Sequence, residues 1–175
     1  MRPRRTPWYP IGVDDIITPR LVLHPLTRAE AERLAAGAPD PGEERADGYP
    51  DEGDRAGARR FLRVWAEEGD PRPFGAYEIR RRADGRAIGG AGFHRPPDGR
   101  GSVTIGYGLI VSARGEGYAS EAVRALLELA WKLGVVRVEA DTDLDNIGSR
   151  RVLEAVGMRQ VAEDSELRFY RIEPA

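Results

Sequence analysis

The stretch SARGEGYASEAV, residues 112–123, decides the fold, because it sets two glycines directly in front of a long amphipathic pattern. Apolar residues at helical spacing run on from Ala122 to Leu133, and the following Gly134 is typical of a helix end. A strand-like run ending at Val111 precedes the stretch. We therefore predict a strand, a tight turn and a helix whose free N-terminus faces the turn.

This turn is suited to holding an anion. Unpaired amide N–H groups and the positive end of the helix dipole point at whatever occupies it. The glycines allow close approach of the backbone, the arginine adds charge, and Ser120 offers a hydroxyl. We call residues 114–120 the glycine loop, and its candidate phosphate-binding residues are Arg114, Gly115, Glu116, Gly117, Tyr118, Ala119 and Ser120. A plain turn that needs glycine for a positive φ is the alternative interpretation.

Two familiar phosphate motifs fit the stretch poorly. A Walker A loop needs a lysine that is absent here. A dinucleotide fingerprint would begin at Gly115 and Gly117, with Glu139 near the expected distance downstream. However, Ser120 occupies the third glycine position, and the strands before the turn read as antiparallel. An NAD-binding module therefore stays as a competing hypothesis.

The chain before the turn reads as a strand and two helices. The run RLVLHPL (20–26) alternates as a strand does, after a strand-like lead at residues 16–17. Thr27 and Glu30 form a capping box for a helix that runs to residue 37. An acidic loop rich in Gly and Pro follows, and a second helix is predicted over 54–69.

Strands dominate the middle of the chain and return at its end. Turn signals, among them Asp84-Gly85, separate three strands and predict an antiparallel meander. After the central helix we expect a parallel strand, a short helix and a terminal hairpin. The expected segments are strands 74–81, 87–94, 102–111 and 135–142, a helix over 145–157, and hairpin strands 158–164 and 166–173.

These elements predict an α+β fold with a mixed sheet, in which four antiparallel strands precede one parallel strand, with about four helices. We expect residues 1–17 to form an irregular arm and residues 18–175 to form a single domain. A chain of 175 residues is long enough to bury a substantial core.

The composition excludes several classes of function. The chain has no cysteine, and His24 and His94 are its only histidines, so we expect no metal site. The 27 Lys and Arg residues are balanced by 29 Asp and Glu residues, which argues against a nucleic-acid partner. No run is long and apolar enough for a membrane span, and no secretory signal is apparent. We expect a soluble, cytoplasmic protein with no membrane partner.

The glycine loop also resembles motif A of the GNAT acyl-CoA N-acyltransferase superfamily, whose pattern [QR]-x-x-G-x-[GA] is met by Arg114, Gly117 and Ala119. Three further segments, TPRLVLHPLT (18–27), IGGAGF and VTIGYGL, resemble strands of the branch that includes ribosomal-protein N-terminal acetylases and antibiotic-modifying acetyltransferases. DNIGSRRVLEAVGM resembles the N-x-x-S segment of that branch. The resemblance runs from about residue 18 to about residue 172.

The resemblance implies a fold whose fourth and fifth strands splay apart to form a cleft for acetyl-CoA, the cosubstrate. Backbone groups of Leu109, Ile110 and Val111 would pair with the pantetheine arm, and the glycine loop would hold the diphosphate. An amine would attack the thioester directly in a ternary complex, with no acyl-enzyme. A backbone N–H near Leu109 would stabilise the oxyanion.

The resemblance also implies a general acid, and here the chain departs from the common pattern. Many members carry a tyrosine seven residues after the Asn146 position, whereas this chain has Leu153. Ser149 is the replacement that resembles this branch, and Asn146 would orient the pantetheine arm. Helix capping is the structural alternative for both residues.

The general base is open. Related sequences often carry a glutamate where this chain has Thr104. The candidates are Glu139, Asp141, His94 and an acidic side chain of the long loop such as Asp51 or Glu52; water relayed to bulk solvent is a further alternative.

The resemblance places acceptor specificity in the loop and helix over 38–69. Its carboxylates would attract a cationic amine, and Tyr49 or Trp65 would form an apolar wall. The candidate substrate residues are Tyr49, Asp51 and Glu52. We expect a polyamine-like or aminoglycoside-like small-molecule acceptor, with a protein N-terminus as the alternative, and a monomer or homodimer. A non-catalytic acyl-CoA sensor is the rival class.

Overall fold

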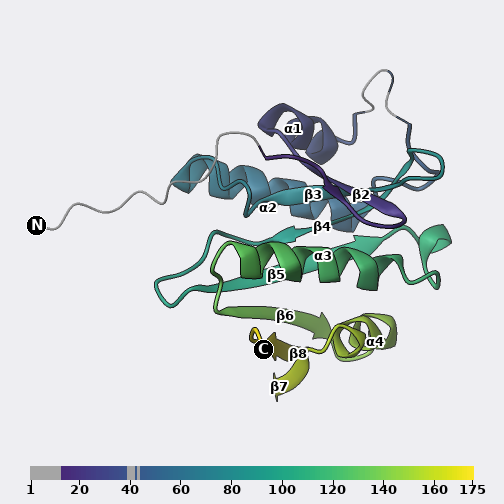
Figure 1. Ribbon diagram of the computed structural model, residues 1–175. Coiled ribbons are helices and arrows are strands. Elements are labelled where there is room, and N and C mark those ends of the chain that lie inside the picture. Colours follow the sequence, from purple (N-terminus) through teal and green to yellow (C-terminus); the bar gives the residue numbers. More distant parts are fainter. Residues whose placement is uncertain (1–12, 39–41, 43) are drawn as a thin grey trace, which may run out of the picture.

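The structure, a computed structural model, describes residues 13–38, 42 and 44–175. Most of the predicted N-terminal arm, and Glu43 among the loop carboxylates, lie outside the described residues. The first described strand, β1 (Ile16–Ile17), pairs antiparallel with β2 (Leu21–Pro25), so the end of the arm joins the sheet (Figure 1).

Both predicted N-terminal helices form, and local capping explains where they begin. Helix α1 (Arg28–Ala36) starts at the capping box of Thr27 and Glu30. Helix α2 (Glu52–Glu68) starts two residues earlier than predicted, because Asp51 accepts a hydrogen bond from the Asp54 amide and the Asp54 carboxylate accepts one from the Asp51 amide. The acidic loop is shorter for that reason.

The predicted meander is confirmed, with one difference at its end. Its strands are β3 (Ala76–Arg81), β4 (Ala87–Phe93) and β5 (Ser102–Leu109), and each is antiparallel to the next. Strand β5 was expected to run to residue 111, but it ends at Leu109 and a short 3₁₀ turn, η1 (Val111–Ala113), follows.

The second half of the chain contains the long helix, the parallel strand and the terminal hairpin that the sequence predicts. Its elements are α3 (Tyr118–Lys132), β6 (Arg137–Asp143), α4 (Ile147–Ala155), β7 (Arg159–Glu163) and β8 (Leu167–Ile172). The eight strands of the described residues form one sheet in the order β1-β2-β3-β4-β5-β6-β8-β7. The mixed α+β fold is therefore confirmed.

The sheet opens at its centre. Strands β5 and β6 run parallel, but only residues 102–104 pair with residues 137–139. Beyond that point β5 stays with β4, while residues 138–143 of β6 pair with β8. The outer half of β5 therefore has one edge free of strand partners, which creates the expected splayed gap.

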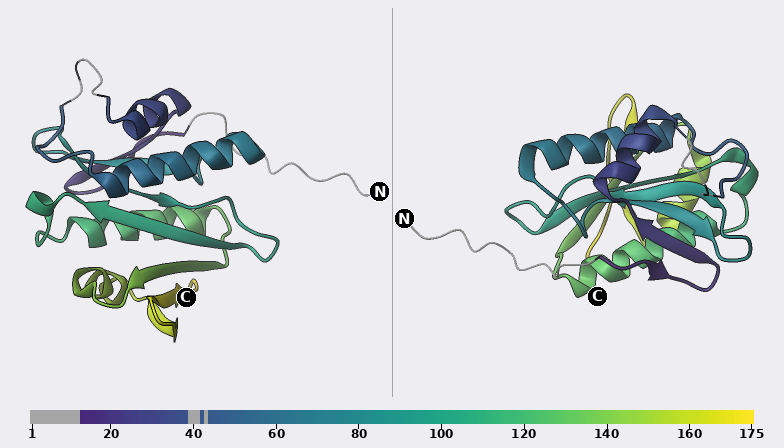
Figure 2. Two further views of the ribbon diagram at one scale, coloured as in Figure 1. Left: turned by 180° about the vertical axis from the view of Figure 1, so that it is seen from behind. Right: turned by 90° about the horizontal axis from the view of Figure 1, so that it is seen from above.

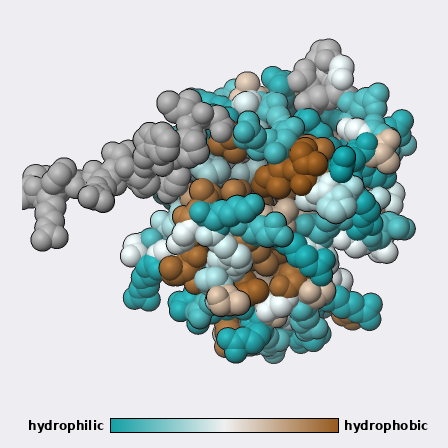
Figure 3. All heavy atoms as spheres, in the orientation of Figure 1, coloured by the Kyte–Doolittle hydropathy of each residue, from teal (hydrophilic) through white to brown (hydrophobic). Residues whose placement is uncertain are grey.

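Helices α1 and α2 cover one face of the sheet, and α3 covers the other (Figure 2, right). The core lies on both faces and includes the fully buried Leu23, Ile79, Val123 and Leu126. On the surface seen in Figure 3, apolar residues gather toward the centre and hydrophilic residues surround them. No helix of the described residues is long and apolar enough to cross a membrane.

Candidate active site

The glycine loop is built as an open cradle of amides. Gly115 and Gly117 have φ values of 84° and 80°, in the left-handed region that favours glycine. Gly117 is the N-cap of α3, so no side chain caps the helix. Among the described residues, the first amide of this helix with a backbone acceptor is that of Glu121, bonded to the Gly117 carbonyl at 3.1 Å. Within the part of the chain that the structure describes, the amides from Gly115 to Ser120 have no backbone acceptor, as binding of a diphosphate requires.

Two arginines brace the glycine loop. The Arg114 Nε donates to the Leu109 carbonyl at 3.1 Å, which ties the loop to the end of β5. Arg20, the residue before β2, donates from Nη1 to the Glu116 carbonyl at 2.7 Å. Its Nε also donates to the Glu121 carboxylate at 2.7 Å, and its guanidinium lies 4.6 Å from the centre of the Tyr118 ring. The loop is therefore held from both sides, and positive charge lies beside it.

The free edge of β5 presents alternate backbone N–H groups to the gap. The Ile110 amide donates to the carbonyl of Ile88 in β4 at 3.0 Å, so this N–H faces β4. Because N–H directions alternate along a strand, the Leu109 N–H faces the opposite edge. Of the three predicted pantetheine-pairing residues, Leu109 therefore offers its amide to the gap, Ile110 does not, and Val111 lies exposed in η1.

The N-terminus of α4 holds a pair of hydroxyls. Asn146 caps the helix, and its Oδ1 accepts from the Ser149 amide at 2.9 Å. The Ser149 Oγ lies 2.8 Å from the Tyr107 hydroxyl of β5, and either hydroxyl can donate; Tyr107 also donates to the Ser149 carbonyl at 3.1 Å. Burial raises the pKa of Tyr107 to about 12, although the bond to Ser149 opposes the rise. Both groups therefore remain protonated near neutral pH.

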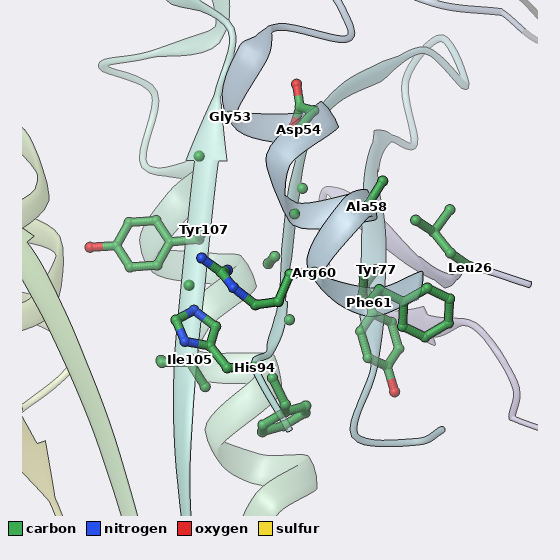
Figure 4. Close-up of a pocket in the computed structure, with 18 of the residues that line it drawn as sticks. Leu26, Gly53, Asp54, Ala58, Arg60, Phe61, Tyr77, His94, Ile105 and Tyr107 are labelled. Carbon is green, nitrogen blue, oxygen red and sulfur yellow. The ribbon is translucent and has the colours of Figure 1, made fainter. Parts of the chain in front are cut away.

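A cavity of about 280 Å³ lies between α2 and the sheet, and it continues to the N-terminus of α4. Figure 4 shows Arg60 reaching from α2 toward His94 and β5, while Tyr107 projects from β5 on the side away from α2. The polar lining residues that matter for chemistry are Tyr49, Asp54, Arg60, His94, Tyr107, Asp141 and Ser149.

Acidic groups gather at the end of the cavity where α2 begins. Burial raises the pKa of Asp54 to about 7, and the charges of Asp51 and Glu78 add to the rise. Tyr49, only 7% exposed, donates its hydroxyl to Glu78 Oε2 at 2.8 Å. Burial and Glu78 raise the pKa of Tyr49 far above its usual value. Asp54 therefore alternates between protonated and ionised forms near neutral pH.

His94 lies at the other end of the cavity. Burial lowers the pKa of its imidazole, and the charge of Arg60 lowers it further, although Asp141 opposes this. An alanine methyl at Gly106 would lie 2.8 Å from His94 Nε2, so the imidazole covers that glycine. His94 is thus a neutral, half-buried imidazole on the face of the sheet that α2 covers.

The structure separates the remaining predicted site residues from the cavity lining. The Glu139 carboxylate accepts from Arg171 Nη2 of β8 at 3.1 Å. Glu52 is paired with Arg59 on the exposed side of α2, and Asp51 caps that helix. Ser149, His94 and Tyr49 line the cavity, whereas Glu139, Asp51 and Glu52 do not.

The sequence does not single out three polar residues of the cavity. Tyr107 lies within a predicted strand, and its partner Ser149 lies 42 residues away along the chain. Asp54 and Arg60 lie in the helix predicted over 54–69. The D-x-x-D spacing of Asp51 and Asp54 is a capping-box pattern and could have indicated that α2 begins early.

The described residues contain no group of three or more His, Cys, Asp or Glu side chains that could hold a metal ion. The residues of the glycine loop do fit a diphosphate, because their amides have no backbone acceptor within residues 13–38, 42 and 44–175, and a Cβ at Gly115 would project into open space.

Comparisons with known proteins point in the same direction. Residues 20–159 match the family described as Acetyltransferase (GNAT) domain. The uncharacterized N-acetyltransferase YjdG of Bacillus subtilis (strain 168) is 31% identical over 100 residues, a match that spans 55% of this chain and 58% of that protein.

Solved structures share the fold. An acetyltransferase from Agrobacterium tumefaciens str. C58 superposes with a TM-score of 0.64 at 24% identity, covering 95% of this chain and 98% of that one. A ribosomal L7/L12 alpha-N-protein acetyltransferase in complex with coenzyme A superposes with a TM-score of 0.64 at 16% identity, covering 91% and 98%.

Proposed function

The chain belongs to the GNAT acetyltransferase family, and we propose that it transfers the acetyl group of acetyl-CoA to a primary amine of a small molecule. Acyl-CoA-dependent N-acetyl transfer is the activity of the family, and acetyl-CoA is its cosubstrate. The acceptor class and the residue roles below are our proposals for this chain.

The donor side of the site is formed by the glycine loop and the edge of β5. The amides from Gly115 to Ser120 and the N-terminus of α3 bind the diphosphate, and the two bracing arginines keep them in place. The pantetheine arm enters the gap between β5 and β6, where Asn146 orients it. The Leu109 N–H then donates to the thioester carbonyl oxygen as negative charge develops on it.

Ser149 supplies the proton that the departing sulfur needs. Its oxygen lies 2.8 Å from the Tyr107 hydroxyl, so Tyr107 holds the serine in place and can return a proton to it. Asn146 fixes the same residue through its backbone amide, at 2.9 Å. This arrangement fills the role that the tyrosine at the Leu153 position has in other members.

One observation carries the acceptor assignment: a single cavity is lined by the acidic Asp54 and Asp141 and by Ser149 at the start of α4. An amine bound beside these carboxylates can therefore reach a thioester beside Ser149 without a movement of the fold. A volume of about 280 Å³ suits a small molecule or one arm of a larger amine. Its carboxylates favour a cationic group.

A screen of acceptors tests the proposal. Polyamines, aminoglycosides, amino acids and peptides that begin at a free N-terminus are incubated with acetyl-CoA, and amine-dependent release of free thiol is measured. We expect turnover with small amines. Turnover with peptides alone would indicate a protein acceptor, and binding of coenzyme A without turnover of any amine would indicate a sensor; both would contradict the proposal.

The predicted acceptor carboxylates can be tested in the same assay. Asp51→Asn and Glu52→Gln remove negative charge at the start of α2, outside the cavity lining, while preserving size. We expect the KM for the amine to rise and the KM for acetyl-CoA to stay the same. An equal rise for both substrates would contradict a role in binding the acceptor.

A further inference from the structure

The cavity holds a carboxylate that the mechanism above does not yet use. Asp54 lies in the first turn of α2, and its Oδ2 accepts from the Asp51 amide at 3.0 Å. Its Oδ1 faces the sheet, because a methyl at Gly90 of β4 would lie 3.2 Å from that oxygen. One oxygen is therefore held in place, and the other is available to a ligand.

The register of the sheet places this oxygen beside the reacting centre. Gly90 pairs with Gly108 of β5, and opposed residues of an antiparallel pair point to the same face. A side chain at Gly108 would meet nothing within 4 Å, so the space beside Asp54 is open there. Gly108 directly precedes Leu109, whose N–H faces the gap.

His94 is the competing proton acceptor, and the same register disfavours it. Its imidazole lies over Gly106. In β5, Gly106 is three residues before Leu109, whereas Gly108 directly precedes Leu109. Two residues of a strand span roughly 7 Å. The sheet therefore places Asp54 nearer to Leu109 than His94.

We propose that Asp54 is the general base, which takes a proton from the acceptor ammonium through its Oδ1. This rests on the proposed function. The ammonium loses a proton to Asp54, and the neutral amine forms the N–C bond as the C–S bond breaks. The second nitrogen proton leaves to water, the sulfur takes a proton from Ser149, and solvent replaces it through Tyr107. Asp54 then releases its proton, so the reaction yields the amide, the free thiol and one proton.

The surroundings of Asp54 suit this role. Asp51 on its own helix and Glu78 on β3 face it with negative charge, and Tyr49 of the preceding loop donates to Glu78. The arginines near this acidic group contact its other members: Arg80 pairs with Glu78 at 2.7 Å, and Arg45 lies 5.9 Å from the Tyr49 ring centre. Burial and these acidic neighbours raise the pKa of Asp54 to about 7, which matches a base that works near neutral pH.

The test is the pH dependence of kcat/KM for the amine. We expect the wild type to lose activity below about pH 7, tenfold for each pH step. Asp54→Asn keeps an oxygen for the Asp51 amide and should lower kcat/KM about 10²-fold while removing this acidic limb. Asp54→Glu should retain the limb. As a control, Asp164→Asn alters a carboxylate that also accepts backbone amides, but in the terminal hairpin, and should leave the profile unchanged.

Two outcomes would overturn the role of Asp54 but not the proposed function. One is that kcat/KM of Asp54→Asn falls below about pH 7 as in the wild type. The other is that His94→Gln, and not Asp54→Asn, loses this fall in kcat/KM. If Asp54→Asn does not fold, Asp51→Asn decides, because removal of its charge should move the limb to lower pH; an unmoved limb overturns the proposal. Failure of the wild type to release thiol with any small amine overturns the proposed function itself, and the role of Asp54 with it.

Discussion

The Tyr107 hydroxyl of β5 lies 2.8 Å from the Ser149 Oγ at the start of α4, across the gap where the sheet opens. Tyr107 lies in the part of β5 that does not pair with β6, and Ser149 lies in the helix that follows β6. Their hydrogen bond therefore spans the cleft and fixes the position of the serine relative to the free edge of β5.

This pairing predicts a graded loss of activity. Ser149→Ala removes the proton donor and should lower kcat about 10²-fold, with little change in the KM for acetyl-CoA. Tyr107→Phe leaves the serine but removes its partner, and should lower kcat about tenfold. Steady-state kinetics with saturating amine measure both. A KM effect without a kcat effect in Ser149→Ala would contradict its role as acid.

The glycine loop offers a matched comparison of two glycines. Gly115 and Gly134 have φ values of 84° and 81°, and a side chain at either would meet nothing within 4 Å. Alanine should destabilise the fold similarly at both, by about 1 kcal/mol. We expect only Gly115→Ala to weaken coenzyme A binding in titration calorimetry, because its methyl enters the cradle. Equal affinity of both variants would contradict this.

Arg20 should matter for the cosubstrate although it lies far from the glycine loop in sequence. Arg20→Gln removes the bonds to the Glu116 carbonyl and the Glu121 carboxylate, and we expect a higher KM for acetyl-CoA with kcat nearly unchanged. Arg28→Gln removes the same charge from an exposed pair with Glu32 and serves as the control. A similar KM in both variants would show that Arg20 does not brace the loop.

The raised pKa of Asp54 also predicts a pH dependence of stability. The folded state binds this proton with a pKa of about 7, against 3.8 for the usual side chain. Stability therefore falls as pH rises through this window and levels off above it. Relative to the wild type, Asp54→Asn should gain up to about 4 kcal/mol in free energy of unfolding between about pH 4 and pH 8. Urea unfolding at both pH values measures this gain, and a constant difference would contradict it.

Local chemistry explains what the sequence could predict. The turn before α3 and the capping box of Thr27 depend only on residues close together in the sequence, so both could be predicted without knowledge of the fold. The end of β5 at Leu109 could not be placed, because η1 has no side-chain cap to mark its start.

Long-range packing explains what the sequence could not predict. Glu139 forms an ion pair with Arg171 because β8 lies between β6 and β7 in the sheet. The turn signals in the sequence predict the hairpin but not which of its strands lies beside β6. The Tyr107–Ser149 bond depends on how α4 sits over the open gap. The position of Asp54 depends on α2 packing closely over Gly90.

The central claim is that the amides of the glycine loop bind the diphosphate of coenzyme A. The most direct measurement is amide chemical-shift mapping by ¹⁵N-resolved NMR, with coenzyme A and with pantetheine, which lacks the diphosphate. We predict large downfield shifts of the amides from Gly115 to Ser120 with coenzyme A and small shifts with pantetheine. Unshifted loop amides in the presence of saturating coenzyme A would contradict the account.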